Sequence, residues 1–162
     1  MLSLTVPKRG RDGKPGCRKR KRTSFLEQSD NLQDPWPPRA ITYDPAKPVT
    51  GVVFDLEGRF FERELLPVVI TMAEDKSNLT VYSIKNVKPK VIRTYGVVRY
   101  ADTLDLAKKN PYIGDNALVI PVEAVTKENM IVIGFEGARI LKETTRHGND
   151  YLSEAKVIVS AQ

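Results

Sequence analysis

Two carboxylates lie two residues apart at the end of an apolar run in the first half of the chain. Residues 52–54 are Val-Val-Phe, and Asp55 and Glu57 follow them. Alternate residues of a β-strand point to the same face, so this spacing places both carboxylates on one side of a strand. Two carboxylates on one face can hold divalent cations of the kind used in two-metal phosphoryl hydrolysis. Asp55 and Glu57 are therefore candidate metal ligands and candidate catalytic residues.

This stretch resembles a motif of a known enzyme family. The residues Val-Val-Phe-Asp-Leu-Glu-Gly at positions 52–58 are similar to the first motif of the DEDD 3′–5′ exonucleases, in which an Asp-x-Glu closes the first strand of a ribonuclease H-like domain. The resemblance covers residues 50–145 and implies a nuclease that uses Mg²⁺ or Mn²⁺. Glu136, which follows a later apolar run, is the candidate for a further acidic ligand. The family's His-x4-Asp motif is not present.

The apolar pattern of the chain after residue 48 predicts a β-sheet. The runs at 52–54, 130–133 and 157–159 are continuously apolar, which is typical of strands buried on both faces. Further strands are predicted at 67–72, 79–84, 91–100 and 117–121, and a hairpin turn at 75–78.

Two segments between these strands predict helices. Asp102 and Thr103 can cap a helix over residues 104–109. Residues 136–145 predict a second helix, with Ala138, Ile140 and Leu141 on its inward face.

The order of these elements predicts the fold class. Because the second helix lies between the apolar runs 130–133 and 157–159, we expect a right-handed crossover that joins a parallel pair of strands. The sequence therefore predicts an α/β or α+β domain over residues 49–162, with a mixed β-sheet and two or three helices. The order βββ-α-β-α-β is the ribonuclease H-like plan.

Basic and aromatic side chains alternate in residues 91–100. Arg93, Tyr95, Arg99 and Tyr100 could stack on and clamp single-stranded nucleic acid if they lay on one sheet face. Ordinary cross-strand packing with extended arginines is the competing interpretation.

The charge of the chain is concentrated at its N-terminus. Residues 1–22, the basic arm, hold nine basic side chains and one acid, Asp12, for a net charge of +8. Since the whole chain carries +6, residues 23–162 carry −2. The arm is predicted to be disordered, because it has almost nothing apolar to bury. Its basic residues are the candidate nucleic-acid-binding residues: Lys8, Arg9, Arg11, Lys14, Arg18, Lys19, Arg20, Lys21 and Arg22.

This basic arm resembles a bipartite nuclear-localisation signal, and it also has the composition of a phosphate-binding segment. A solubilising tail and attraction to an anionic surface are the remaining interpretations. Residues 23–48 are predicted to be a Pro-rich linker that holds Trp36, the only tryptophan. Trp36 could stack on a base, dock into a partner or fold back onto its own domain.

Composition also limits which cofactors, partners and cellular compartment we expect. One Cys excludes an intrachain disulfide, and one His with one Cys argues against a Cys/His zinc site. No apolar run reaches the ~18 residues needed to span a bilayer. We therefore expect no membrane partner, no resident cofactor unless the protein is a metal-dependent nuclease, and an intracellular protein that is nuclear if its host is eukaryotic.

Three functions follow from these features. The first is a binding protein held on DNA or RNA by its basic arm, with nuclear import machinery as a further partner. The second is a small or degenerate exonuclease that uses Asp55, Glu57 and Glu136. The third is a viral or ribosomal structural protein whose arm neutralises RNA.

Overall fold

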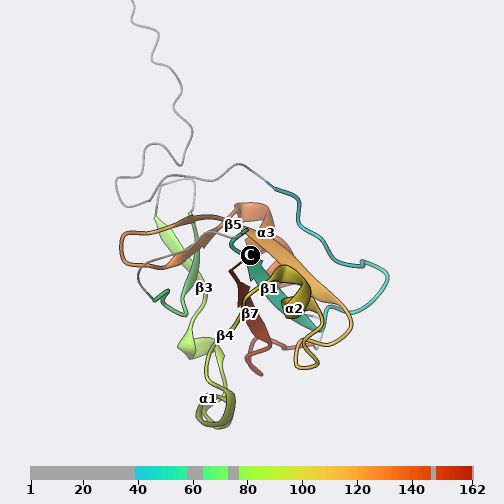
Figure 1. The fold of residues 1–162 in the computed structure, drawn as a ribbon. Helices are drawn as coiled ribbons and strands as arrows, with labels where there is room; N and C mark the ends of the chain where they lie inside the picture. The colour runs from blue at the N-terminus through green and yellow to red at the C-terminus, as the bar shows by residue number, and fades with distance from the viewer. Residues whose placement is uncertain (1–38, 58–63, 73–76, 147–148, 162) are drawn as a thin grey trace, which may run out of the picture.

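The folded part of the chain is a mixed α/β unit. A computed structural model describes residues 39–57, 64–72, 77–146 and 149–161. In chain order, its elements are β1 (Gly51–Asp55), β2 (Val69–Met72), β3 (Asn78–Tyr82), the 3-10 helix η2 (Ile84–Asn86), α1 (Pro89–Tyr95), β4 (Arg99–Ala101), α2 (Leu104–Lys108), β5 (Ala117–Val125), β6 (Ile131–Ile133), α3 (Phe135–Arg146) and β7 (Val157–Ser160). The prediction of a mixed sheet with a few helices is confirmed (Figure 1).

The seven described strands form one sheet in the order β3-β2-β6-β5-β1-β7-β4. The strands β5, β1, β7 and β4 are parallel neighbours. β6 runs antiparallel to β5, β2 runs parallel to β6, and β3 closes the far edge antiparallel to β2. β1 therefore lies inside the parallel half, with Asp55 at its carboxyl end.

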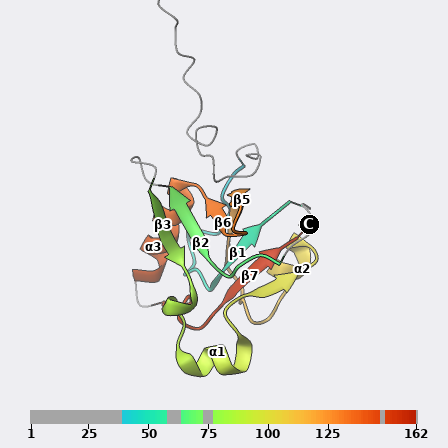
Figure 2. The same ribbon diagram turned by 90° about the vertical axis from the view of Figure 1, so that its left-hand side faces the viewer.

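Helices cover both faces of this sheet. Figure 2 shows α3 on one side of the strands and α2 on the other, with α1 beyond one end. Phe54 of β1 and Leu141 of α3 belong to the larger core cluster, whereas Val53 packs with Ala107 of α2 in a smaller cluster. The continuous apolar run of β1 is explained by this arrangement, because successive side chains enter opposite cores.

Several strand and helix predictions are confirmed. The runs at 52–54, 130–133 and 157–159 correspond to the buried strands β1, β6 and β7. Thr103 caps α2 by accepting the amide N–H of Leu106, and α3 covers the second predicted helix. Residues 75 and 76 of the predicted hairpin turn lie outside the described residues, and Asn78 begins β3.

The prediction of a strand over residues 91–100 is wrong. Residues Pro89–Tyr95 form α1, and only Arg99–Ala101 form a strand, β4. Pro89 occupies the first turn of the helix, where a missing N–H costs nothing. Gly96 ends the helix with φ 77°, in the left-handed region that favours glycine.

The predicted parallel pair on either side of α3 is also wrong. β5 and β1 separate β6 from β7, and β6 runs antiparallel to this parallel group. The connection through α3 therefore joins strands of opposite direction. β1 pairs with β5 and β7 rather than with β2, which follows it in the chain, so the ribonuclease H-like plan is not confirmed.

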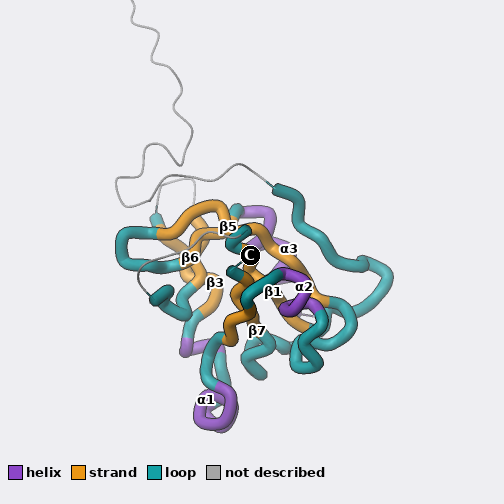
Figure 3. The backbone as a smooth tube through the Cα atoms, viewed as in Figure 1, coloured by secondary structure: helices purple, strands orange, loops and turns teal. Residues whose placement is uncertain are grey.

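Residues 39–50, here called the strap, lie against the domain. Figure 3 shows this segment as a long loop before β1. Thr42 and Val119 of β5 pair as an antiparallel bridge with two backbone hydrogen bonds, of 3.1 and 2.8 Å. Thr42, which belongs to the predicted linker, therefore pairs with the sheet, whereas residues 43–48 are exposed.

Candidate functional site

Arg39 of the strap joins the two acids at the end of β1. Its Nη1 donates to Asp55 Oδ2 at 3.0 Å, and its Nη2 donates to the backbone carbonyl of Asp55 at 3.0 Å. Nη2 also reaches the carbonyl of Val122 at 3.3 Å. The Nε atom lies 3.1 Å from Glu57 Oε2, without the alignment of a hydrogen bond, so this contact is an ion pair.

The two carboxylates converge because of the turn that follows β1. Asp55 Oδ1 accepts the amide N–H of Glu57 at 3.0 Å and the hydroxyl of Ser160 at 3.4 Å. Glu57 has φ 52°, so the chain has left the strand and the two acids are no longer in simple strand alternation. Both acids contact Arg39, but Glu57 lies beyond the end of β1, so the predicted placement of the two carboxylates on one face of a strand does not describe this turn.

Arg39 offsets one of the two negative charges of the acidic pair. The Asp55 side chain is 13% exposed and that of Glu57 is 53% exposed. A guanidinium group between two carboxylates leaves a local charge of −1. Its planar fork matches a carboxylate and two carbonyls at once, which an ammonium group could not do.

These residues do not fit a two-metal centre. The Arg39 guanidinium lies on the oxygen atoms that a divalent cation would need, namely Asp55 Oδ2 and Glu57 Oε2. Among the described residues, no group of three His, Cys, Asp or Glu side chains could hold a metal ion. Glu136 pairs instead with Arg139, one turn further along α3.

A pocket of about 610 Å³ lies beside Arg39. It is defined by Arg39, Ile41, Ile120, Pro121, Glu123, Gly134, Phe135, Glu136, Gly137 and Ile140 and is called the Arg39 pocket below. Its walls come from the strap, β5 and the start of α3. Most of these side chains are apolar, and Phe135 is 69% exposed.

Glu123 gives the Arg39 pocket an unusual polar group. Burial raises the pKa of its carboxyl group above the ordinary value of 4.5. Within the described residues, Glu123 has no hydrogen bond or ion pair. Gly134 permits this arrangement, because a Cβ atom there would collide with the Glu123 carboxylate.

Gly137 is a second glycine in the lining of the same pocket. A Cβ atom at Gly137 would lie 2.8 Å from Cγ2 of Ile120. The absence of this atom lets α3 lie close to β5 at this wall of the pocket.

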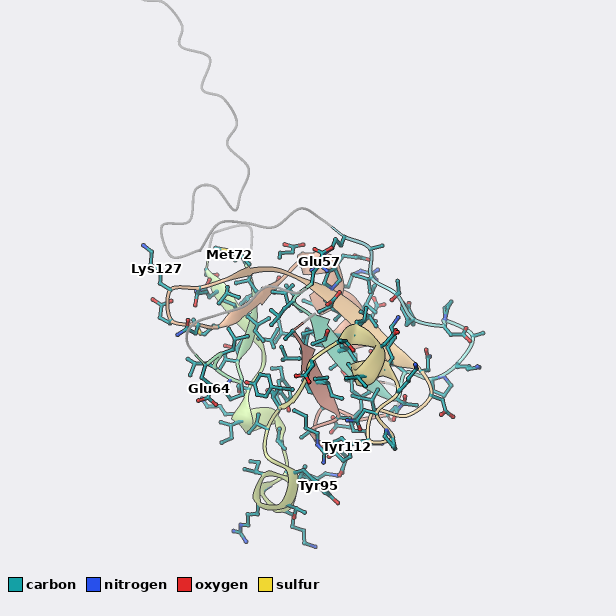
Figure 4. All side chains as sticks on the ribbon, in the orientation of Figure 1. Glu57, Glu64, Met72, Tyr95, Tyr112 and Lys127 are labelled. Carbon is teal, nitrogen blue, oxygen red and sulfur yellow. The ribbon has the colours of Figure 1, made fainter. Side chains whose placement is uncertain are left out.

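The predicted stacking residues are not on one strand. Tyr95 ends α1, whereas Tyr100 lies in β4 and donates its hydroxyl to the carbonyl of Leu65 at 3.1 Å. Arg99 lies over the rings of Tyr112, at 3.8 Å, and Tyr95, at 5.1 Å. Figure 4 shows Tyr95 and Tyr112 together, at the end of the domain opposite Glu57.

The basic arm and Trp36 lie outside the described residues, so the structure does not place these predicted site residues. Arg39 and Glu123 were not identified from the sequence. The available signal for Glu123 was a single acid within the otherwise apolar run 117–125. Arg39 follows Pro37-Pro38 and gave no comparable signal. None of the described helices has the length and hydrophobicity of a membrane-spanning segment.

Comparison with known proteins gives one family. The model described as the second domain of Treponema pallidum Tp0624 matches residues 51–161. The match begins at the first residue of β1 and ends after β7, so it includes the whole described sheet. It leaves out Arg39 and the rest of the strap before β1. No curated protein matches the chain.

Proposed function

The chain belongs to the family of the second domain of Treponema pallidum Tp0624, and we propose that it is a nucleic-acid-associated binding protein whose basic arm contacts phosphates. The family description states no activity, so the proposal rests on the residues. Because the family is named after a bacterial protein, phosphate contact rather than nuclear import is the role proposed for the arm.

The observation that carries this proposal is the separation of charge along the chain. The arm has a net charge of +8, and the rest of the chain has −2. When basic side chains neutralise phosphates, counterions condensed on the nucleic acid are released. This release contributes favourable binding free energy that does not depend on the nucleotide sequence. The domain itself does not need to follow the phosphate backbone.

The domain contributes a scaffold in this proposal. The strap is held on β5 through Thr42 and at the end of β1 through Arg39. The segment that enters the domain from the arm is thus fixed at the carboxyl ends of the parallel strands. The acids at this edge are paired with Arg39, which reduces their repulsion of a phosphate backbone.

The direct test compares variants of equal net charge. One full-length variant replaces the five consecutive basic residues Arg18, Lys19, Arg20, Lys21 and Arg22 by Gln. The control replaces five exposed domain lysines by Gln: Lys85, Lys90, Lys108, Lys127 and Lys142. In filter binding to random single- and double-stranded DNA and RNA, we expect the arm variant to lose most of its affinity and the control to lose little. Equal losses would show that net charge alone, and not the arm, drives binding.

The exonuclease remains the competing proposal. It requires Mg²⁺ or Mn²⁺ at Asp55 and Glu57, and it has weaker support because Arg39 already pairs with both carboxylates. Its test is Mn²⁺-dependent degradation of end-labelled single strands. Degradation by the intact protein that disappears in Asp55→Asn would favour the enzyme over the binding protein.

A further inference from the structure

The Arg39 pocket has the lining of an aromatic binding site. Ile41, Ile120, Pro121 and Ile140 provide apolar contacts, and Phe135 leaves most of its ring exposed at the rim. The volume of about 610 Å³ is within the range of pockets that enclose small ligands. Glu123 adds a hydrogen-bond acceptor that has no partner among the described residues.

The strap leads directly to this pocket. Thr42 pairs with Val119 in an antiparallel bridge, so residues upstream in the strap lie beside residues downstream in β5. The hydrogen bond from Arg39 Nη2 to the carbonyl of Val122 agrees with this direction. Beyond Val122, the same direction leads along β5 to Glu123.

The nearest aromatic residue upstream is Trp36, three residues before Arg39. Three extended residues span about 10 Å, which is enough to bring an indole from Arg39 into the pocket that Arg39 lines. Pro35, Pro37 and Pro38 flank Trp36 and have no backbone N–H to continue pairing with β5. Their fixed φ angles also lower the entropy lost when this segment becomes ordered.

We propose that Trp36 docks in the Arg39 pocket, where its ring packs between Ile41, Phe135 and Ile140 and its indole N–H donates to Glu123. An indole has a large apolar surface and one donor that needs an acceptor when it is buried. The pocket offers both, and the tether of three residues makes the local concentration of the indole high. This docking makes Trp36 unavailable for stacking on bases. It also anchors the chain at a point about 14 residues after Arg22, the last basic side chain of the arm.

Intrinsic fluorescence tests this directly, because Trp36 is the only tryptophan. In the full-length protein, selectively excited tryptophan emission should lie at shorter wavelength than in the guanidinium-unfolded chain. The acrylamide quenching constant should be several-fold lower than that of N-acetyl-tryptophanamide. Emission and quenching typical of a fully exposed indole would overturn the proposal. The measurement needs no nucleic acid, so its outcome is independent of the proposed function.

Two variants of the Arg39 pocket test whether the Trp36 indole is buried there. Ile140→Asp places a charge in the wall, and Phe135→Ala removes a ring from the rim, where the exposed side chain makes a folding defect small. Both should shift the emission to longer wavelength and raise quenching, with unchanged far-UV circular dichroism. Leu106→Asp, at an exposed position of α2 on the other face, is the matched control and should change neither quantity. A buried emission that neither pocket variant alters would place the indole elsewhere and overturn the proposal.

A dilution series identifies whose tryptophan occupies the pocket. Docking within one chain predicts emission and quenching that do not change with protein concentration. A loss of the short-wavelength emission on dilution would show that the tryptophan of a second copy is bound, which contradicts docking within the chain.

Discussion

Arg39 and Asp55 form the contact that connects the strap to the central strand of the parallel half. Arg39 Nη1 lies 3.0 Å from Asp55 Oδ2, and Nη2 lies 3.0 Å from the carbonyl of the same residue. The two residues are 16 positions apart in the chain, and their side chains are only 19% and 13% exposed. This pair holds the entry of the chain at the carboxyl end of β1.

Loss of the Arg39 side chain should destabilise the domain. Arg39→Ala leaves the mostly buried carboxylate of Asp55 without its cation, and we expect a loss of about 2–3 kcal/mol of unfolding free energy in urea. Arg39→Lys should recover only part of this stability, because an ammonium cannot reach all the acceptors of the guanidinium.

A double-mutant cycle tests whether Arg39 and Asp55 are coupled directly. Asp55→Asn should lower the free energy of unfolding much less in the Arg39→Ala background than in the unchanged protein. Additive losses in this double-mutant cycle would contradict direct coupling. Lys47→Ala, which breaks an exposed ion pair with Asp44, is the control and should cost less than about 1 kcal/mol.

Glu123 should make stability depend on pH. Burial raises the pKa of its carboxyl group, so the folded state favours the protonated form and ionisation is easier in the unfolded chain. The stabilisation by the protonated form is complete below the ordinary pKa of 4.5 and is lost as the pH rises through the folded value. Glu123→Gln should therefore raise the melting temperature at neutral pH and have little effect in acid. A melting-temperature series against pH checks this, with the exposed Glu128→Gln as control. A benefit that does not grow with pH would contradict it.

Asn116 should be the second point that holds the strap. Its buried side-chain amide donates to the carbonyls of Asp44 and Lys47, at 2.9 and 3.0 Å, and its carbonyl accepts the amide N–H of Asp44. Asn116→Ala removes these bonds, each of which contributes about 0.5–1.5 kcal/mol, so we expect a loss of about 2–3 kcal/mol in chemical denaturation. Asn86→Ala in the 3-10 helix η2, where the exposed side chain accepts the amide N–H of Ser83 at 2.8 Å, is the control and should cost about 0.5–1 kcal/mol. Equal costs would show that the strap does not depend on Asn116.

Thr71 should tolerate removal of its hydroxyl. The side chain lies in β2, the residue is 4% exposed, and its Oγ1 has no hydrogen-bond partner among the described residues. A buried hydroxyl without a partner costs free energy, and valine has nearly the same shape. We expect Thr71→Val to be neutral or to stabilise by about 1 kcal/mol. Thr103→Val, which removes the cap of α2, should instead destabilise by about 1 kcal/mol. A destabilised Thr71→Val would show that the hydroxyl has a partner.

The parts of the fold that were predictable are local in the sequence. The run 52–54 predicted a doubly buried strand because β-branched and aromatic residues continue without polar interruption. Thr103 predicted the start of α2 through its capping side chain. α1 was missed because its seven residues are too few to distinguish helical from alternating periodicity.

The features that could not be predicted depend on distant pairing. The direction of β6 is set by its neighbour β5 and not by the helix that follows it. The partners of Arg39 are likewise distant in the chain, and a lone arginine after two prolines has no periodic or motif signal. Asp55 and Glu57 were found from their spacing, but the cation that pairs with them was not.

The salt dependence of binding tests the central claim most directly. Each phosphate contact contributes about 0.9 to the slope of log affinity against log salt for duplex DNA, and about 0.7 for single strands. We predict that Gln substitution of the five basic residues from Arg18 to Arg22 lowers the magnitude of this slope by several units. The matched domain-lysine variant should keep the slope of the unchanged protein. An arm variant whose slope equals that of the unchanged protein would contradict the assignment of phosphate contacts to the arm.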